Sequence, residues 1–130
     1  MEVRELAYTA PQLDRGVGAL KVPPHSVEAE QSVVGGLLLD NSTWEQVGDM
    51  VAEDDFYRRE HRMLFRAITD LAAQGIPFDV VTLSERLSKT GDLENAGGFA
   101  YIATLARDTP SAANITAYAR IVRENSVLCN

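Results

Sequence analysis

The chain has 130 residues, of which 45% are hydrophobic, so it is long enough for one globular domain and too short for two of ordinary size. Its 19 acidic and 12 basic residues give a net charge of −7, which disfavours nucleic-acid binding by the surface as a whole. The single cysteine, Cys129, excludes an internal disulfide. Residues 1–18 contain no apolar run typical of a signal peptide, and no later run reaches the length of a membrane span, so we expect a cytoplasmic protein.

The beginning of the chain is predicted to pass from a flexible arm into a helix. Residues 1–19 mix Glu, Arg, Pro and Gly without a regular period, which indicates a flexible arm. Residues 20–24 form an extended lead-in, because the residue before a proline is pushed out of the helical region. Ser26 then has the position of an N-cap, and a mostly apolar stripe at helical spacing predicts a helix over 27–39.

Two features of the 27–39 helix stand out. Glu28 and Glu30 lie in its first turn, where the helix dipole favours acidic side chains, although Glu30 is also a member of the stripe. Gly35 and Gly36 lie inside the helix, at a cost of about 1 kcal/mol each relative to alanine. Such a cost is usually offset by the close approach of another backbone, so we expect a tight helix crossing at this point.

The next two predicted helices differ in length. Ser42 to Glu45 fits a capping box, in which the two side chains satisfy backbone N–H groups at the start of a helix. The apolar face of the short helix that follows consists of Trp44, Val47 and Val51. The clearest helical pattern of the chain comes next, and Gly75 and Pro77 stop it. Its apolar stripe consists of His61, Leu64, Phe65, Ile68, Leu71 and Ala72.

Three more helices complete the predicted set. Asp79 caps the first, which ends at Gly91; a Gly-Gly pair at 97–98 opens the second; and a Pro-Ser pair at 110–111 begins the last. The apolar stripe of the first helix consists of Val80, Leu83 and Leu87. That of the second consists of Phe99, Tyr101, Ile102 and Leu105, and that of the last of Ile115, Tyr118, Ala119 and Val122. The last pattern stops at the end of the chain without a capping signal, so we expect more protein beyond it.

These patterns predict an all-α fold, a compact bundle of about six helices, because no stretch shows the sustained alternation typical of strands. We divide the chain into the arm 1–19, a globular helical domain 20–110 and a final helical segment 111–130. No internal repeat or low-complexity tract is present.

The sequence lacks the residue patterns of common catalytic and metal sites. No phosphate-binding G-x-x-x-x-G-K-[ST] motif occurs, and two histidines and one cysteine far apart do not form a metal site. His61 is either a general base or, as we favour from its place on an apolar face, a packed histidine with a satisfied ring nitrogen. Residues 53–55 are acidic but lack the spacing of a calcium loop, so we interpret them as acids at a helix N-terminus.

Arg58, Arg62 and Arg66 form the only basic stripe of note, because their spacing places them on one face of a helix. This stripe is either a docking surface for an acidic partner or, as we favour, a solvated face supported by Glu60 and Asp70. It is also the only candidate surface for a nucleic-acid-binding helical module, which is the main alternative function.

Five motifs in order give the chain a close resemblance to the start of the bacterial replicative DNA helicase, the DnaB family. The motifs are PPHSVEAEQSVVGG at 23–36, DDFYR at 54–58 followed by His61, DVVTL at 79–83, GGFAY at 97–101, and TPSAAN at 109–114 followed by Tyr118 and Ala119. The resemblance extends from Leu20 to the end of the chain, and five ordered motifs are far more specific than any one of them.

The resemblance implies the role of an assembly domain. Members of that family have an N-terminal helical domain, a linker and a C-terminal RecA-like ATPase, which uses ATP and Mg²⁺ to move on single-stranded DNA. Six subunits form a ring, and the N-terminal domains form a collar that is a trimer of dimers. This collar receives primase and in some bacteria is near the influence of a helicase loader. By this resemblance the chain is the N-terminal domain alone, without a catalytic site or cofactor, and 111–130 is the first arm of a truncated helical hairpin through which collar domains pair.

Motif matching also singles out individual residues. Glu28 and Tyr101 are the candidates for contact with primase, although Glu28 is also explained as a first-turn acid and Tyr101 as a core ring with its hydroxyl at the surface. Ile115, Tyr118 and Val122 are candidates for the pairing hairpin, and the alternative is that they belong to the core of the domain itself. Besides the assembly domain and the nucleic-acid-binding module, a third hypothesis is a small-molecule-binding regulatory domain or enzyme, which requires a polar constellation that we do not find.

Overall fold

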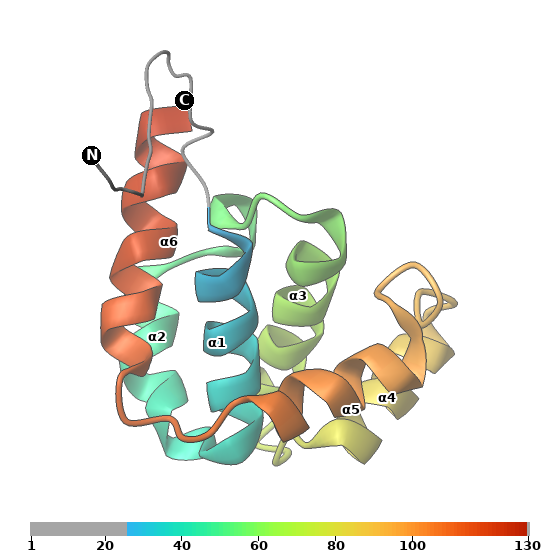
Figure 1. Cartoon of the computed structure of the whole chain (residues 1–130). Coiled ribbons are helices and arrows are strands. Elements are labelled where there is room, and N and C mark those ends of the chain that lie inside the picture. The colour runs from blue at the N-terminus through green and yellow to red at the C-terminus, as the bar shows by residue number, and fades with distance from the viewer. Residues whose placement is uncertain (1–25, 130) are drawn as a thin grey trace, which may run out of the picture.

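The computed structural model describes residues 26–129, so the predicted arm 1–19 and the lead-in 20–24 lie outside the described residues. The described part is all α-helical and contains no strand, which confirms the predicted fold class (Figure 1). Its elements are α1 (Val27–Leu39), the 3-10 helices η2 (Asn41–Thr43) and η3 (Glu53–Asp55), α2 (Trp44–Met50), α3 (Arg59–Ala73), α4 (Val80–Lys89), α5 (Gly98–Asp108) and α6 (Ile115–Cys129).

Helix α1 is the centre of the bundle. It stands between α6 and α3, and α5 passes near its lower end (Figure 1). Six consecutive residues of α1, Val33 to Leu38, are buried, which fits a helix whose apolar residues surround its axis rather than line one face. Helices α3, α5 and α6 pack directly on α1, whereas α2 packs mainly on α6, and α4 packs on α3 and α5.

The predicted tight helix crossing at the two glycines of α1 is confirmed. A methyl group at Gly35 would lie 2.0 Å from the hydroxyl oxygen of Thr109 and 2.6 Å from the carbonyl oxygen of Leu105. A methyl group at Gly36 would lie 2.9 Å from a terminal carbon of Ile115. Glycine is therefore needed at both positions because α5 and the start of α6 approach the α1 backbone from two sides.

Several predicted helix ends are also confirmed. The Ser26 side chain accepts a hydrogen bond from the backbone N–H of Ala29, as an N-cap does. Asp79 caps α4 and forms a capping box with Thr82. Gly75 and Gly91 adopt positive φ angles of 71° and 77° just after α3 and α4, where a left-handed residue ends a helix.

The capping box predicted at Ser42 to Glu45 is wrong. The carboxylate of Asp40 accepts hydrogen bonds from the backbone N–H and the hydroxyl of Ser42, and this caps η2 rather than α2. Thr43 occupies the N-cap position of α2 without a side-chain hydrogen bond. An aspartate two residues earlier competes successfully because its carboxylate is a stronger acceptor than a serine hydroxyl.

Two other boundaries differ from the prediction. The last helix begins at Ile115, not at residues 110–111, because the intervening segment forms a turn in which the Ser111 hydroxyl accepts from the Ala113 N–H. The acids at 53–55 form η3 by themselves and are not the first turn of α3, which begins at Arg59. The start of this short helix is capped by a hydrogen bond from the Ala52 N–H to the Asp55 carboxylate.

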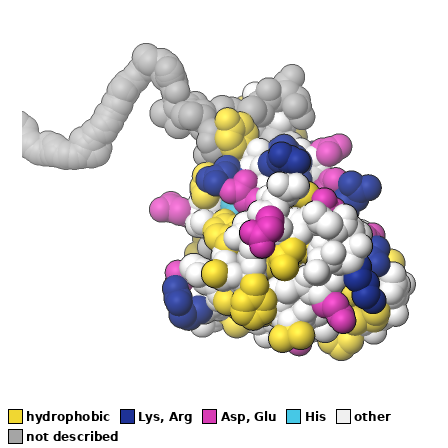
Figure 2. Space-filling view, turned by 90° about the vertical axis from the view of Figure 1, so that its right-hand side faces the viewer, with side chains coloured by type: hydrophobic (Ala, Val, Ile, Leu, Met, Phe, Trp, Pro, Cys, Tyr) yellow, Lys and Arg dark blue, Asp and Glu magenta, His cyan; other side chains and the backbone are white. Residues whose placement is uncertain are grey.

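Charged side chains of both signs are interspersed with apolar ones on the face shown in Figure 2. No helix between residues 26 and 129 is both long enough and apolar enough to cross a membrane.

We expect Gly35→Ala to lower the free energy of unfolding by about 1–3 kcal/mol, because the new methyl group collides with backbone and side-chain atoms at the helix crossing. Chemical denaturation of the purified chain measures this change. Gly48→Ala is the matched control, since the three atoms nearest to a methyl group there belong to the Trp44 side chain, at 3.0–3.5 Å, and none is a backbone atom. A Gly35→Ala variant as stable as the unmodified chain would show that the crossing is looser than described.

Candidate functional site

A buried polar network joins the first turns of α1, α3 and α5. Glu30 on α1 is only 2% exposed and His61 on α3 is completely buried, which is unusual for two ionisable side chains. Tyr101 on α5 is half-buried and completes the network towards the surface. The three residues come from separate helices, so the network exists only in the folded bundle.

The Glu30 carboxylate accepts hydrogen bonds at both of its oxygens. Oε1 lies 2.7 Å from Nδ1 of His61 and accepts from the backbone N–H of Arg58 at 3.2 Å, and Oε2 accepts from the backbone N–H of Tyr57 at 2.6 Å. Both N–H groups lie in the segment just before α3. The cost of burying the Glu30 carboxylate is therefore offset by its contacts with two backbone N–H groups of that segment and with the imidazole of His61.

His61 connects Glu30 to Tyr101. Its Nε2 lies 2.6 Å from the Tyr101 hydroxyl, and the two rings are nearly parallel, with an interplanar angle of 12° and a centroid distance of 6.0 Å. The amide nitrogen of Gln31 donates to the same hydroxyl at 3.2 Å. Both ring nitrogens of His61 have partners, which confirms the interpretation of a packed histidine with a satisfied ring.

The surroundings of Tyr101 also affect its ionisation. Removal of the phenol from water raises the pKa of Tyr101 above its ordinary value of 10.0, and the hydrogen bond from Gln31 only partly opposes this effect. The hydroxyl therefore stays protonated at neutral pH and remains able to donate.

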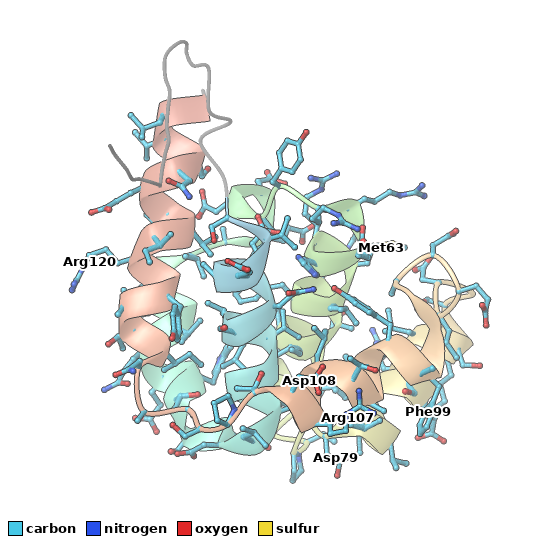
Figure 3. All side chains as sticks on the ribbon, viewed as in Figure 1. Met63, Asp79, Phe99, Arg107, Asp108 and Arg120 are labelled. Carbon is cyan, nitrogen blue, oxygen red and sulfur yellow. The ribbon has the colours of Figure 1, made fainter. Side chains whose placement is uncertain are left out.

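A cleft of about 210 Å³ lies between α1 and α5, beside the network. Its lining consists of Glu28, Gln31, Ser32, Tyr101, Thr104, Leu105, Asp108 and Thr109. The structure thus brings together Glu28 and Tyr101, the two residues predicted as partner contacts, although 73 positions separate them (101 − 28). Asp108 adds a second carboxylate to the lining. It forms an ion pair with its exposed neighbour Arg107 at the C-terminal end of α5, and Phe99 lies at the opposite end of this helix (Figure 3). The lining itself contains acidic but no basic side chains.

The predicted pairing residues of α6 occupy a different environment. Ile115 and Val122 are 3% and 2% exposed and belong to the core of the domain, and Tyr118 packs against that core. Their role in the domain's own packing is therefore established by the structure, while a role in pairing stays a prediction. The exposed apolar side chains of α6 are instead Ile121, Val127 and Leu128, and Arg120 points away from the bundle (Figure 3).

An acidic side chain fastens α6 to η3. The carboxylate of Asp55 accepts from the guanidinium of Arg123 at 3.0 Å and from the buried hydroxyl of Ser126 at 2.7 Å. Of the three acids at 53–55, Asp55 thus binds α6. Among residues 26–129, no three His, Cys, Asp or Glu side chains are grouped so that they could hold a metal.

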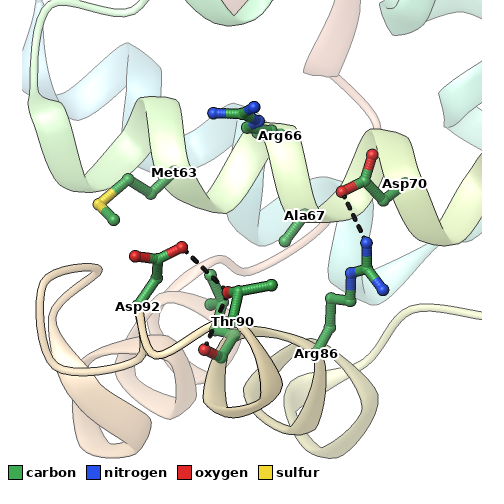
Figure 4. A pocket seen from close by; sticks show the side chains of 8 residues that line it. Met63, Arg66, Ala67, Asp70, Arg86, Thr90 and Asp92 are labelled. Atoms are coloured by element: carbon green, nitrogen blue, oxygen red, sulfur yellow. Dashed lines mark hydrogen bonds and ion pairs between the residues drawn. The ribbon is translucent and has the colours of Figure 1, made fainter.

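The basic stripe on α3 is partly used within the molecule. Arg58 pairs with Glu60, and the guanidinium of Arg62 donates to the carbonyl oxygens of residues 56 and 57, at 3.0 and 2.7 Å. Asp70 pairs with Arg86 of α4 and not with an arginine of the stripe (Figure 4). Arg66 lines the groove between α3 and α4 and is the exposed member that faces it.

Neither Glu30 nor Gln31 was among the predicted site residues. One signal was available for Glu30, because it is an acid within an otherwise apolar helical stripe, a place where a charge is not tolerated without partners. Nothing local indicated that its partner is His61, 31 residues further along the chain.

We expect Glu30→Ala to lower the free energy of unfolding by at least about 2 kcal/mol, because each buried donor left without an acceptor costs about 1–3 kcal/mol. The two backbone N–H groups and the imidazole all lose their acceptor. Denaturant titration measures the change. Glu28→Ala in the same turn is the control, since Glu28 is exposed and its loss should change stability by about 0.5 kcal/mol at most. Equal effects of the two substitutions would contradict the role of Glu30.

We also expect Tyr101 to ionise above pH 10 in the folded chain, because burial disfavours the phenolate. An unfolded tyrosine ionises near pH 10, so the contribution of this group to stability is complete below about pH 10 and declines as the pH rises towards the folded pKa. The ¹³Cζ resonance of Tyr101 reports the pKa, and unfolding at several alkaline pH values, with Tyr101→Phe for comparison, reports the stability. A midpoint at or below pH 10 would contradict this expectation.

The chain has close relatives among known proteins. Three relatives, each named replicative DNA helicase DnaB, come from Buchnera aphidicola, Pasteurella multocida and Geobacillus stearothermophilus. They are 47%, 46% and 42% identical over 89%, 89% and 83% of this chain. The matches cover 25%, 24% and 24% of the relatives, so the chain spans about a quarter of the length of the curated relatives it matches.

The fold has a solved counterpart. The crystal structure of the N-terminal domain of DnaB helicase from Mycobacterium tuberculosis superimposes with a TM-score of 0.80 at 41% sequence identity, and the match covers 83% of this chain and 78% of that one. Residues 22–124 match the family described as the DnaB-like helicase N terminal domain. The chain therefore belongs to the family of DnaB-like helicase N-terminal domains.

Proposed function

We propose that this chain is the assembly and partner-docking domain of a hexameric replicative DNA helicase that works in the cytoplasm. In this proposal the domain forms the collar of the ring together with other helicase subunits, binds primase and, where one is present, lies near the helicase loader. ATP-driven unwinding of DNA, with its ATP and Mg²⁺, belongs to a C-terminal domain, and single-stranded DNA is contacted by the full ring. This proposal is supported by the family to which the chain belongs. It is also supported by the relatives named replicative DNA helicase, since the match covers about a quarter of their length and leaves room for a further domain in them.

The observation that carries the docking role is the α1–α5 cleft. Glu28 and Tyr101 line it together, although motif matching selected them from separate segments. Glu28 and Asp108 make the lining acidic, so the cleft suits a basic side chain of primase. A tyrosine beside such a cleft is also the residue type that most often dominates binding energy at protein interfaces.

The pairing role is proposed for α6. Its outward side carries Ile121, Val127 and Leu128, of which the last is 73% exposed, so this side offers apolar surface to a second copy or a hairpin arm. Ile115 and Val122 hold the helix on the core, and the Asp55 carboxylate fastens its second half. In this proposal Ile115, Tyr118 and Val122 support pairing by fixing the helix that presents the outward side chains.

We expect Tyr101→Ala to weaken binding of the C-terminal domain of the cognate primase about tenfold or more, because truncation of a hot-spot tyrosine costs about 2 kcal/mol and tenfold corresponds to about 1.4 kcal/mol. Glu28→Ala should weaken it less, and its effect should shrink at high salt. Isothermal titration calorimetry measures both. Glu45→Ala is the matched control, because it removes an exposed acid from the first turn of another helix, outside the cleft.

Two outcomes would count against the proposal. Unchanged affinity in both cleft variants would place the primase surface elsewhere, and no complex at high micromolar concentration would remove the docking role. Salt-dependent DNA binding that is lost in Arg62→Gln and Arg66→Gln would instead favour the nucleic-acid-binding module.

A further inference from the structure

Tyr101 belongs both to the acidic cleft and to the buried network, and the network holds it from the inside. We propose that His61, fixed by Glu30, is a positioning residue that sets the Tyr101 ring at the wall of the α1–α5 cleft for partner binding. This inference rests on the proposed function, because it takes Tyr101 as a contact residue.

With a neutral His61 ring, the hydrogen bonds of the network have one consistent direction. The Glu30 carboxylate accepts, so Nδ1 of His61 carries the proton that lies between them. In the neutral ring Nε2 is then an acceptor, and the Tyr101 hydroxyl donates to it. The remaining lone pair of that hydroxyl accepts from the Gln31 amide. A tautomer with the proton on Nε2 alone would place two acceptors 2.7 Å apart at Glu30, so the carboxylate selects the arrangement.

Glu30 in turn cannot easily move. It is held by the backbone N–H groups of Tyr57 and Arg58, which precede α3, while His61 lies in the first turn of α3 itself. One carboxylate therefore fixes the imidazole relative to both α1 and the start of α3. The chain of hydrogen bonds from Glu30 through His61 to Tyr101 can fix the position of the Tyr101 ring because each of these side chains is buried or half-buried and has a partner.

A second contact restrains the same ring. Gly97 has a φ of 106°, and a Cβ built there would lie 2.4 Å from Cδ2 of Tyr101, so the ring packs directly against the backbone that opens α5. Gly97 on one side and the His61 hydrogen bond at the hydroxyl leave the ring little freedom to rotate.

Because the hydroxyl is already engaged by His61 and Gln31, Tyr101 offers the carbon surface of its ring to a partner. An aromatic ring held beside Glu28 and Asp108 matches the aliphatic stem and charged end of an arginine or lysine.

A double-mutant cycle on the chain tests the proposal, with His61→Gln, Tyr101→Ala and both together, and with binding of the primase C-terminal domain as the readout. We expect His61→Gln to weaken binding about fivefold alone and not at all in the Tyr101→Ala background, since the two residues act as a unit. Ile68→Val is the matched control, because it alters a buried residue of the same helix away from the cleft and should leave affinity within about twofold. Equal weakening by His61→Gln in both backgrounds, or none in either while Tyr101→Ala weakens binding, overturns the positioning role.

Nuclear magnetic resonance separates this inference from the proposed function. In the unmodified chain we expect a proton on Nδ1 of His61 and strong Overhauser contacts between the Tyr101 ring and Gly97. In His61→Gln these contacts should weaken and the χ1 coupling constants of Tyr101 should average, while Ile68→Val keeps them.

If Tyr101→Ala and Glu28→Ala both leave primase binding unchanged, the proposed docking point fails, and these spectra alone decide whether His61 positions Tyr101. An unaltered Tyr101 side chain in His61→Gln, or an Nδ1 without a proton in the unmodified chain, overturns the inference. Should His61→Gln fail to fold, Tyr101→Phe in the same spectra removes the same hydrogen bond, and retained ring contacts and χ1 couplings there overturn it equally.

Discussion

The carboxylate of Glu30 is buried between the first turn of α1 and the start of α3, and the relative placement of α1, α3 and α5 depends on how it is satisfied. Removal of such a charge from water is tolerated only when hydrogen bonds replace the lost hydration. The segment before α3 supplies two backbone donors, and His61 supplies a third. An apolar side chain at this position would pack as well, but it would not specify which part of the chain lies against α1.

The close helix crossing at Gly35 complements this polar contact. It lets the end of α5 approach the α1 backbone, while the Tyr101 hydroxyl ties the other half of α5 to α3 through His61. The cleft that carries Glu28 and Tyr101 lies along the two helices joined in this way. The surface proposed for partner binding thus lies between helices that these two contacts hold together.

The two ends of the domain have different tasks in the proposed function. The cleft presents acidic groups and an immobilised ring, which suits recognition of a basic partner. Helix α6 presents apolar side chains on its outward side and extends beyond the other helices (Figure 1), which suits pairing with another helix. Asp55 links the two regions along the chain, because it fastens α6 two residues before the backbone that Glu30 holds.

The sequence alone determined the helices, most of their caps, the close crossing at the paired glycines and the family, because these depend on short-range patterns and on motif order. It also identified His61 as a packed residue from its place on an apolar stripe. Only the tertiary structure decided that Glu30, an acid of the first turn of α1, also binds His61, that Ile115 and Val122 face the core, and that Glu28 and Tyr101 share a cleft. The capping box at Ser42 and the predicted start of the last helix failed for local reasons, a competing Asp40 carboxylate and a turn in which the Ser111 hydroxyl accepts a hydrogen bond. The buried contacts could not be predicted for a different reason: side chains far apart in sequence compete for the same buried partners, and that competition is settled only when the helices pack.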